Sequence, residues 1–270
     1  MIRKILYSLI LMMFLQINFV QAGSEGSESL KNSKSNNTAN ECFEGVSRVV
    51  FKFNYALDGM VFEPIARGYR SLPQDLRIGT GNAVNNLRSL LTLTNNVLQG
   101  DFKGAVNTGG RFAINTTVGI LGIFDPATKL GFEKPQKEDF GQTMGVWGIN
   151  SGCYFVLPIL GPTTTRDAVG LIGNTFLDPV FQITHNTEIA NGVVGNGNYS
   201  EHNYYYYRGT SAVDFRAKNI EPFDSLKNNS IDLYASVKSL YLQDRNKKIT
   251  GVNSSTKTFN DNDWEEIDSN

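Results

Sequence analysis

Histidine and cysteine are scarce in this sequence of 270 residues, which contains two of each. They are scattered along the chain, without the spacing of zinc ligands, as Cys42, Cys153, His185 and His202. A phosphate-binding loop with its lysine is also missing, and Gly79-Thr80-Gly81 lacks the third glycine of a dinucleotide-binding turn. We therefore expect a protein without a metal ion or an organic cofactor.

The sequence also lacks an excess of charge of one sign. The 25 basic and 26 acidic residues leave a formal charge of -1, which argues against a general nucleic-acid-binding protein. The mean hydropathy of -0.24 excludes a protein with several membrane spans. The 26 glycines are close to the average for this length, so neither a collagen nor a low-complexity protein is indicated.

The signature of a serine hydrolase is absent as well. Gly141-Gln142-Thr143-Met144-Gly145 imitates the nucleophile motif with a threonine, and neither histidine lies in a recognisable partner context. We expect no enzyme. A periplasmic hydrolase that uses Thr143 or Ser151 as its nucleophile is the catalytic alternative.

The N-terminus has the pattern of a cleavable signal peptide. A basic pair, Arg3 and Lys4, precedes an apolar run from Ile5 to Phe14, and Val20-Gln21-Ala22 supplies a signal-peptidase site. The apolar run is shorter than the roughly 20 residues that cross a bilayer. We expect residues 1–22 to be removed from an exported protein, with an uncleaved N-terminal anchor as the alternative.

Export would place the two cysteines where disulfides form. The sequence does not show whether the sulfur atoms of Cys42 and Cys153 meet, so a disulfide and two free thiols both stay open. The polar, acidic approach Ala39-Asn40-Glu41 differs from a lipoprotein signal. We therefore expect Cys42 to carry no lipid and the protein not to be lipidated.

Helical patterns dominate the mature chain after a polar, flexible leader at residues 23–42. One apolar stripe at three- and four-residue spacing runs from Val46 to Val61 and includes Phe53. Pro64 either kinks this helix or opens the next one. We expect further helices after caps at Asp75, Asp101, Asp125 and Thr163–Asp167, with Gly100 as a stop, and then over residues 204–217 and 231–247.

The stretch from Phe140 to Gly161 differs, because glycines interrupt an apolar and aromatic sequence. It is too rich in glycine for a regular helix, so we expect irregular or hairpin structure. Trp147 and Tyr154 are residue types that favour a boundary between apolar and polar surroundings. Ordinary core packing and contact with a membrane or lipid are both open for this stretch.

These patterns predict a mainly α protein with one domain over residues 43–250. An acidic tail follows at residues 251–270, with Trp264 as an aromatic anchor. Residues 185–203 are polar and glycine-rich, and we expect a loop there.

A series of ordered motifs extends from residue 53 to residue 167. They are Phe53-Asn54-Tyr55-Ala56-Leu57-Asp58, Pro64-Ile65-Ala66-Arg67-Gly68-Tyr69-Arg70, Val97-Leu98-Gln99-Gly100, Arg111-Phe112-Ala113-Ile114-Asn115-Thr116-Thr117-Val118-Gly119, Phe124-Asp125, Glu138-Asp139-Phe140-Gly141-Gln142-Thr143-Met144-Gly145-Val146-Trp147-Gly148, Tyr154-Phe155-Val156-Leu157-Pro158 and Gly161-Pro162-Thr163-Thr164-Thr165-Arg166-Asp167. They resemble those of the MlaA/VacJ family, the outer-membrane component of a bacterial phospholipid-transport system. The resemblance is strong over residues 43–180 and weaker from Leu233 to Asp244.

The resemblance implies a ring-like helical bundle in the inner leaflet of the outer membrane, often beside trimeric porins. Such a protein takes mislocalised phospholipid from the outer leaflet through an amphipathic channel, and a soluble periplasmic carrier returns it. Lipid asymmetry of the outer membrane is thereby maintained. Apolar side chains would face the bilayer, and polar side chains would line the route of the head group. An exported structural or adhesin-like envelope protein without lipid transfer is the alternative.

Two segments are predicted to form the channel and its gate. We expect Phe53 and Asn54 to hold the channel closed, with Asn54 as a polar contact between helices. The segment 118–137 is predicted to be a mobile loop that gates lipid entry. Its candidate gate residues are Gly119, Ile120, Leu121, Gly122, Ile123 and Phe124, and Trp147 and Tyr154 complete the set of candidate lipid contacts.

Overall fold

A computed structural model describes residues 39–186 and 200–251, which belong to one compact unit that extends from residue 37 to 270. The signal peptide, most of the leader, much of the loop at 185–203 and nearly all of the acidic tail lie outside these residues, so the predictions for them stay predictions. Within the described ranges, no helix is both long and apolar enough to cross a membrane.

The unit is mainly helical, as expected, with a small sheet. Its elements are β1 (Asn40–Glu41), α2 (Glu44–Leu57), the π-helical turn η1 (Asp58–Phe62), α3 (Glu63–Arg70), α4 (Gln74–Gln99), α5 (Phe102–Thr117), α6 (Pro126–Lys129), α7 (Phe140–Val146), β2 (Cys153–Leu157), β3 (Gly161–Thr164), α8 (Thr165–Leu177), α9 (Pro179–His185), α11 (Glu201–Lys218), α12 (Ile220–Asn229) and α13 (Leu233–Thr250).

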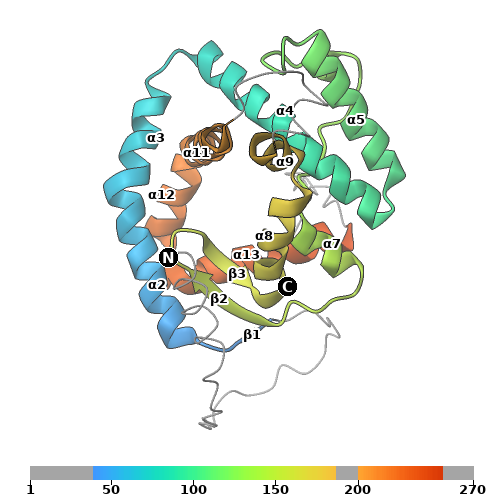
Figure 1. Ribbon diagram of the computed structural model, residues 1–270. Coiled ribbons are helices and arrows are strands. Elements are labelled where there is room, and N and C mark those ends of the chain that lie inside the picture. Colours follow the sequence, from blue (N-terminus) through green and yellow to red (C-terminus); the bar gives the residue numbers. More distant parts are fainter. Residues whose placement is uncertain (1–38, 187–199, 252–270) are drawn as a thin grey trace, which may run out of the picture. The chain divides into compact units, whose positions relative to one another are not determined.

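Within this unit the helices follow one another around a ring (Figure 1). Helix α3 packs against α11, which packs against both α4 and α9. Helix α9 contacts α8, and α8 contacts α7 and the hairpin. The hairpin packs against α2, which brings the chain back to its first helix and closes the ring.

Most of the helix ends lie where the capping residues predict them. Gly100 adopts the left-handed conformation that ends α4 (φ 77°), and Asp101 and Asp125 accept hydrogen bonds from the first turns of α5 and α6. Pro64 lies in the first turn of α3 rather than kinking α2. The prediction for Asp75 is wrong, because α4 begins one residue earlier, after Pro73.

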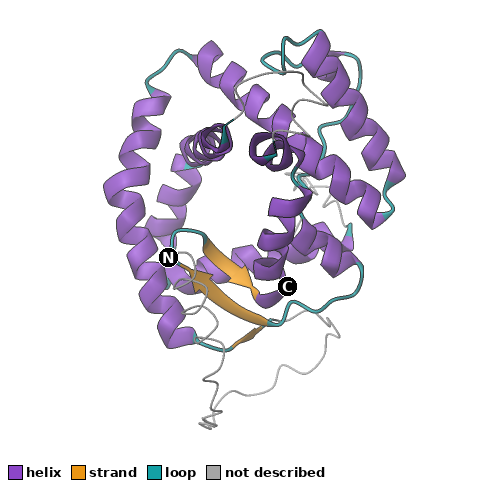
Figure 2. Cartoon of the chain, in the orientation of Figure 1, coloured by secondary structure: helices purple, strands orange, loops and turns teal. Residues whose placement is uncertain are grey.

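The glycine-rich stretch is part helix and part sheet (Figure 2). Its first residues form α7, contrary to our expectation, because the Asp139 carboxylate caps the helix by accepting a hydrogen bond from the Gln142 amide at 3.0 Å. The hairpin is confirmed as the antiparallel pair β2–β3, in which Tyr154 lies opposite Thr164. The short strand β1 adds a parallel edge to β2. Helix α12 was not predicted.

The distribution of polarity is the reverse of an ordinary globular domain, since most buried side chains are polar. The buried apolar residues form two small clusters, Ala66–Ala217–Ile220 and Tyr154–Val156–Tyr234. Large apolar side chains face outward instead, as on α2 and η1, where Val49 and Met60 are 68% and 72% exposed. The expectation that apolar residues face outward and polar residues inward is therefore confirmed.

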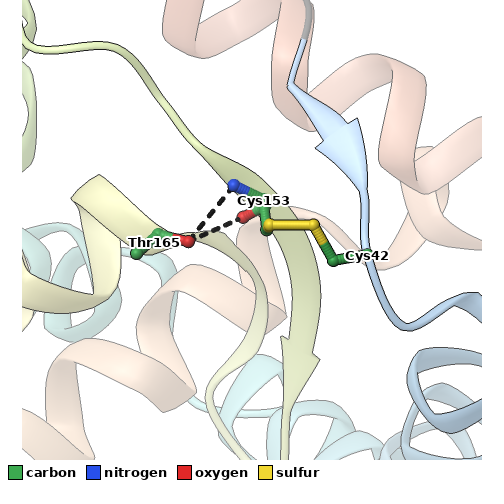
Figure 3. The surroundings of a disulfide bond; sticks show 3 residues. All are labelled: Cys42, Cys153 and Thr165. Atoms are coloured by element: carbon green, nitrogen blue, oxygen red, sulfur yellow. Dashed lines mark hydrogen bonds between the residues drawn. A yellow bond between two sulfur atoms is a disulfide. The ribbon is translucent and has the colours of Figure 1, made fainter. Parts of the chain in front are cut away.

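The cysteine question is settled in favour of a disulfide. Cys42, just after β1, pairs with Cys153 at the start of β2 across 111 residues of chain (Figure 3). The Thr165 hydroxyl accepts a hydrogen bond from the Cys153 amide at 3.2 Å and contacts its carbonyl oxygen at 3.4 Å. The disulfide thus fixes the N-terminal edge of the unit to the hairpin.

Candidate functional site

One face of α4 carries a row of polar side chains, all of them buried or half-buried except the exposed Asn85. They recur at three- and four-residue intervals, which places them on one side of a helix, and are Asn82, Asn85, Asn86, Ser89, Thr92, Asn95, Asn96 and Gln99. Several are almost completely buried, and Asn95 has no exposed surface at all. The opposite face exposes apolar side chains such as Leu76 and Val97. Helix α4 is therefore amphipathic with its polar side inward.

The C-terminal half of this row is held in a closed hydrogen-bond network. The Thr143 hydroxyl on α7 donates to the Asn95 side-chain oxygen at 2.7 Å. The Gln99 amide donates to Glu138 at 3.2 Å and to Thr143 at 3.1 Å, and Asn96 donates to Thr108 on α5 at 3.2 Å. Buried polar groups need such partners, and here they tie α4 to both of its neighbours.

A charged cluster anchors α5 to the turn that follows it. The buried Arg111 guanidinium forms a bidentate pair with Asp125, at 2.8 Å to each carboxylate oxygen, and also donates to Thr128 and to the Phe132 carbonyl. Burial alone would raise the pKa of Asp125, but its hydrogen bonds to Thr128, Asn115 and Arg111 outweigh that effect and lower it. Arg111 is thus fully occupied within the protein.

The N-terminal half of the polar row opens into a cavity of about 210 Å³. Helices α4 and α5 and the extended segment 133–139 supply its wall, which consists of Asn82, Asn85, Asn86, Arg88, Ser89, Thr92, Arg111, Asn115, Asp125, Lys134, Pro135 and Lys137. The wall carries four basic residues and one acidic residue. Because Asp125 is paired with Arg111, the charge left without an opposite partner in the wall is positive.

Three cations of the wall, Arg88, Lys134 and Lys137, form no salt bridge with a carboxylate of the described residues, and Arg88 is the one among them that is half-buried. The Arg88 Nε atom is buried without a hydrogen-bond acceptor among the described residues. Partial burial lowers the pKa of the Lys137 ammonium, and repulsion from the positive charges of Arg88 and Lys218 lowers it further. Two like charges therefore converge on one polar cavity.

A second charged cluster joins three other helices and is fully paired. Arg245 on α13 donates to Asp139 at 2.6 and 3.0 Å and to Asp167 at 2.8 and 3.0 Å. Arg166 and Tyr241 also donate to Asp167. Burial by itself would raise the pKa of Asp139, but Arg245 holds it at about 2. The motifs that contain Asp139 and Asp167 thus meet in space to brace α7 and α8.

Asn54 contacts the hairpin rather than another helix, which corrects one expectation. Its side-chain amide donates to the Leu157 carbonyl at 2.8 Å, and its oxygen accepts from the Ile159 amide at 2.7 Å. Asn54 therefore ties α2 to the β2–β3 turn. Phe53 beside it is 53% exposed and points outward with the apolar stripe.

The segment that follows α5 forms a tight, hydrogen-bonded turn with an apolar exterior. Ile120 and Leu121 have positive φ angles, and Leu121 is 71% exposed. Gly122 (φ 87°) packs so closely on Asn86 that an added Cβ would lie 2.5 Å from the Asn86 Cβ atom. The Gly122 and Phe124 amides donate to backbone carbonyls at 2.8 and 2.9 Å. In this conformation the glycine of the turn allows close packing against α4. The gating role of the segment stays a prediction.

Trp147 and Tyr154 lie in different environments. Trp147 is half exposed, and its indole N–H donates to the Leu98 carbonyl at 3.0 Å, as expected at a boundary. Tyr154 has no exposed surface and packs against Tyr234 and Tyr241. The expectation that Tyr154 contacts lipid is wrong for this structure, because β2 directs its ring into the apolar cluster.

The residues of the hydrolase alternative are not arranged as a nucleophile and its base. The Thr143 hydroxyl is fully buried and donates to Asn95. Of the two histidines, His185 stacks on Phe181 and His202 contacts Ser200. The described contacts therefore pair neither histidine with Thr143 or Ser151.

The cavity residues Arg88, Lys137 and Asn85 were missed by sequence reasoning. Polar residues that alternate with apolar ones normally indicate a solvated surface, so none of the three stood out. A usable signal was present in α4, where the polar residues keep the helical period over more than 15 residues beside the apolar stripe. Had these polar residues been interpreted as the inward face of α4, they would have identified that part of the cavity wall.

Comparison with known proteins identifies relatives of this chain. The family model described as MlaA lipoprotein matches residues 39–248. A protein of Rickettsia prowazekii is 37% identical over 146 residues, which cover 53% of this chain and 58% of that protein. The intermembrane phospholipid transport system lipoprotein MlaA of Haemophilus influenzae is 31% identical over 78% of this chain and 79% of its own length.

A solved structure resembles the fold as well. It comes from a study of the structural basis for maintenance of bacterial outer membrane lipid asymmetry, and its TM-score is 0.64 at 27% sequence identity. The similarity covers 78% of this chain and 99% of that one. The helical fold is therefore shared with a structurally characterised protein.

The comparisons correct the expectation about lipidation. The matching family is described as a lipoprotein family, and the Haemophilus influenzae relative is named a lipoprotein. The prediction that the protein is not lipidated is therefore wrong. It rested on the polar residues before Cys42 and on the signal-peptidase site at Val20-Gln21-Ala22, which no cysteine follows directly.

Proposed function

Because the chain belongs to the MlaA lipoprotein family, we propose that it moves phospholipid at the outer membrane and so maintains the lipid asymmetry of that membrane. It removes mislocalised phospholipid from the outer leaflet and passes it to a soluble periplasmic carrier. The observation that carries this proposal is the reversed polarity of the fold, in which apolar side chains face outward and the inward face of α4 is polar. A phospholipid needs both kinds of surface.

The physical chemistry of the two surfaces supports this role. The exposed apolar residues of α2, α5 and the turn after α5 suit contact with acyl chains, where transfer from water is favourable. A charged head group cannot enter that environment without a large cost, so it follows the polar interior. Transfer needs no bond to be made or broken, and we propose that the protein is not an enzyme.

The partners are part of the proposal. A trimeric porin beside the ring and a soluble carrier on the periplasmic side are what the family resemblance implies. The exposed apolar side chains support placement in the inner leaflet of the outer membrane. The structure contains no nucleotide-binding loop within its described residues, so we propose that the net direction of transfer comes from these partners or from lipid gradients.

Lipid extraction of the purified full-length protein tests the function. We expect phospholipid to co-purify, and cells that lack the protein to accumulate phospholipid in the outer leaflet. A protein that carries no phospholipid and whose loss leaves asymmetry unchanged would instead support an envelope protein with a structural role. Wild-type function after substitution of both Thr143 and Ser151 would remove the hydrolase alternative.

We further propose that the turn at 118–124 gates lipid entry. An engineered disulfide that holds the turn against α4 would test this role. A Cβ atom added at Gly79 would lie 3.1 Å from Ile123 Cγ2, so the side chains of these two positions are in contact and Gly79→Cys with Ile123→Cys is a disulfide pair to test. Oxidation should stop lipid transfer and reduction should restore it, without a lower melting temperature. Undiminished transfer in the oxidised protein would contradict the gate.

The Phe53–Asn54 pair is proposed to hold the channel closed through the hairpin. Asn54→Ala removes both hydrogen bonds to the turn, and we expect more phospholipid in the outer leaflet at normal protein levels. Phe53→Leu, which keeps an apolar outward side chain, serves as the matched control. Normal asymmetry in the Asn54→Ala strain would contradict this proposal.

A further inference from the structure

The polar cavity contains two cationic side chains that the protein itself does not neutralise. Arg88 comes from the inward face of α4, and Lys137 comes from the extended segment before α7. The Arg88 Nε–H is buried without an acceptor in the described part of the chain. No carboxylate there forms a salt bridge with either residue. Leaving a buried donor unpaired destabilises a protein, so this arrangement suggests that a ligand supplies the acceptor.

The other charged groups near the cavity have partners of their own. The buried Asp178 carboxylate, on which the Arg88 charge acts without a salt bridge, accepts from the Val180 amide at 3.0 Å. Arg111 and Asp125 neutralise each other at 2.8 Å. Lys218, whose charge acts on Lys137, is paired with Asp214 at 2.6 Å. Lys134 also lines the wall and, like Lys137, is exposed on one side to solvent. The electrostatic preference of the cavity is therefore for an anion placed between Arg88 and Lys137.

The neutral part of the wall adds further groups that bind anions. Asn85 lies one turn before Arg88 on the same face of α4, and no hydrogen bond engages its side chain within the described residues. The Asn82 and Asn86 amides donate to Ile123 and Thr116, which fixes the wall on either side of the exposed Asn85 amide. A fork of guanidinium donors, an ammonium group and an amide is well suited to phosphate oxygens.

The size of the cavity limits the ligand. Its volume of about 210 Å³ is below the roughly 300–1,000 Å³ of sites that enclose a drug-sized molecule. It has room for a small anionic group and not for a pair of acyl chains. The apolar chains of a bound lipid would lie elsewhere, along apolar surface.

We infer that Arg88, Lys137 and Asn85 form a binding site for the phosphate of a phospholipid head group. This inference rests on the proposed function and deepens it, because it specifies the part of the lipid that the interior recognises. The site would select lipids that carry a phosphodiester over neutral lipids with the same acyl chains. It would not discriminate strongly among head groups attached beyond the phosphate.

Lipid competition with matched acyl chains tests the inference. The full-length protein is incubated with vesicles that contain phosphatidylglycerol, phosphatidylethanolamine and diacylglycerol in equal amounts, re-isolated, and analysed by mass spectrometry. We expect the wild-type protein to retain both phospholipids in preference to diacylglycerol. Arg88→Gln with Lys137→Gln should lower the ratio of phospholipid to diacylglycerol about tenfold, equivalent to about 1.4 kcal/mol.

Matched variants separate this effect from a general change of charge or of fold. Lys103→Gln with Lys129→Gln removes the same charge from exposed positions outside the cavity wall, and its lipid ratio should equal that of the wild type. Arg88→Lys should lie between the wild type and Arg88→Gln, because it keeps the charge and loses the fork. A folded double variant with an unchanged lipid ratio would overturn the inference.

The remaining outcomes separate the inference from the proposed function. If the wild-type protein retains no lipid at all, the proposed function fails and the inference fails with it. If it retains phospholipid and diacylglycerol equally, transfer stands and phosphate recognition fails. Titration with inorganic phosphate is the last experiment. Phosphate binding that depends on Arg88, together with an unchanged lipid ratio in the double variant, would assign the site to free phosphate. That result would overturn the inference that the site binds a lipid head group.

Discussion

Two arginines of the interior, Arg245 and Arg88, illustrate opposite uses of a buried positive charge. Arg245 makes four hydrogen bonds to Asp139 and Asp167, all between 2.6 and 3.0 Å. Arg88 has a buried Nε atom without an acceptor in the described residues and shares its cavity with Lys137. The first arrangement is complete without a ligand, and the second is not. The difference indicates that one side of the ring serves the fold and the other serves binding.

The largest effect should come from breaking the complete cluster. Arg245→Met leaves the Asp139 carboxylate without its ion-pair partner and removes one of the two arginines that bind Asp167, and we expect a loss of about 3–5 kcal/mol in the free energy of unfolding. Urea denaturation followed by circular dichroism measures it. Lys248→Gln on the same helix removes only an exposed pair with Asp244 and should cost less than about 0.5 kcal/mol. Equal losses in the two variants would contradict the distinction.

Removal of the disulfide should have the next largest effect. The bond between Cys42 and Cys153 spans 111 residues, and we expect Cys42→Ser with Cys153→Ser to lower stability by about 2–4 kcal/mol, mainly by freeing the unfolded chain. The change is measured by thermal unfolding of both proteins without reductant. In the presence of reductant the two proteins should melt alike; a difference that persists would indicate an effect of the serines themselves.

Acid should weaken the complete cluster, because Arg245 holds the pKa of Asp139 at about 2, below the ordinary value of 3.8. A depressed pKa stabilises the folded state above pH 3.8, and this contribution is lost as the pH falls from there to about 2. We expect a loss of about 2 kcal/mol over that interval. Asp139→Asn should flatten this part of the stability curve.

Glu138, next to Asp139, supplies the control for that titration. Burial raises the pKa of its carboxyl group, so its contribution has the opposite sign and is lost as the pH rises. Glu138→Gln should therefore keep the acid-induced loss intact. A flat curve in Glu138→Gln would show that the wrong carboxylate had been assigned.

The smallest expected effect is a gain in the free energy of unfolding. Arg88→Gln removes an unpaired cation and its repulsion of Lys137, so we expect stability to rise by up to about 1 kcal/mol. Chemical denaturation of the lipid-free protein measures it. A loss comparable to that of Arg245→Met would mean that Arg88 is part of the scaffold, and the comparison between the two arginines would fail.

Local signals predicted much of the fold. Caps at Asp101, Asp125 and Thr164 and the stop at Gly100 act within a few residues, so their effect is visible in the sequence. Helix α7 was missed because a high glycine content outweighed the Asp139 cap. The ring itself followed from the family resemblance, since periodicity gives the faces of helices and not their partners.

The site was predicted less well, because it depends on which face of each helix turns inward. In ordinary domains the apolar face is buried, so Val84, Leu87, Leu91 and Leu98 were read as one stripe on α4. Val84 and Leu91 are buried, whereas Leu87 and Leu98 are 37% exposed. Periodicity alone cannot show that the apolar face of a helix is the exposed one. The candidate lipid contacts were therefore sought among aromatic residues such as Tyr154, which belongs to the apolar core.

The position of the disulfide also has a mechanical consequence. Strand β1 pairs with β2 over only two residues, Asn40 and Glu41. A pull on the chain ahead of residue 39 would have to peel these two residues from the sheet and break the contacts of Glu41 with Tyr234 and Lys238. Cys42 is the next residue, and its covalent bond to Cys153 stops the peeling there. The load then passes into the β2–β3 hairpin instead of unravelling α2, so an N-terminal tether can bear tension without opening the ring.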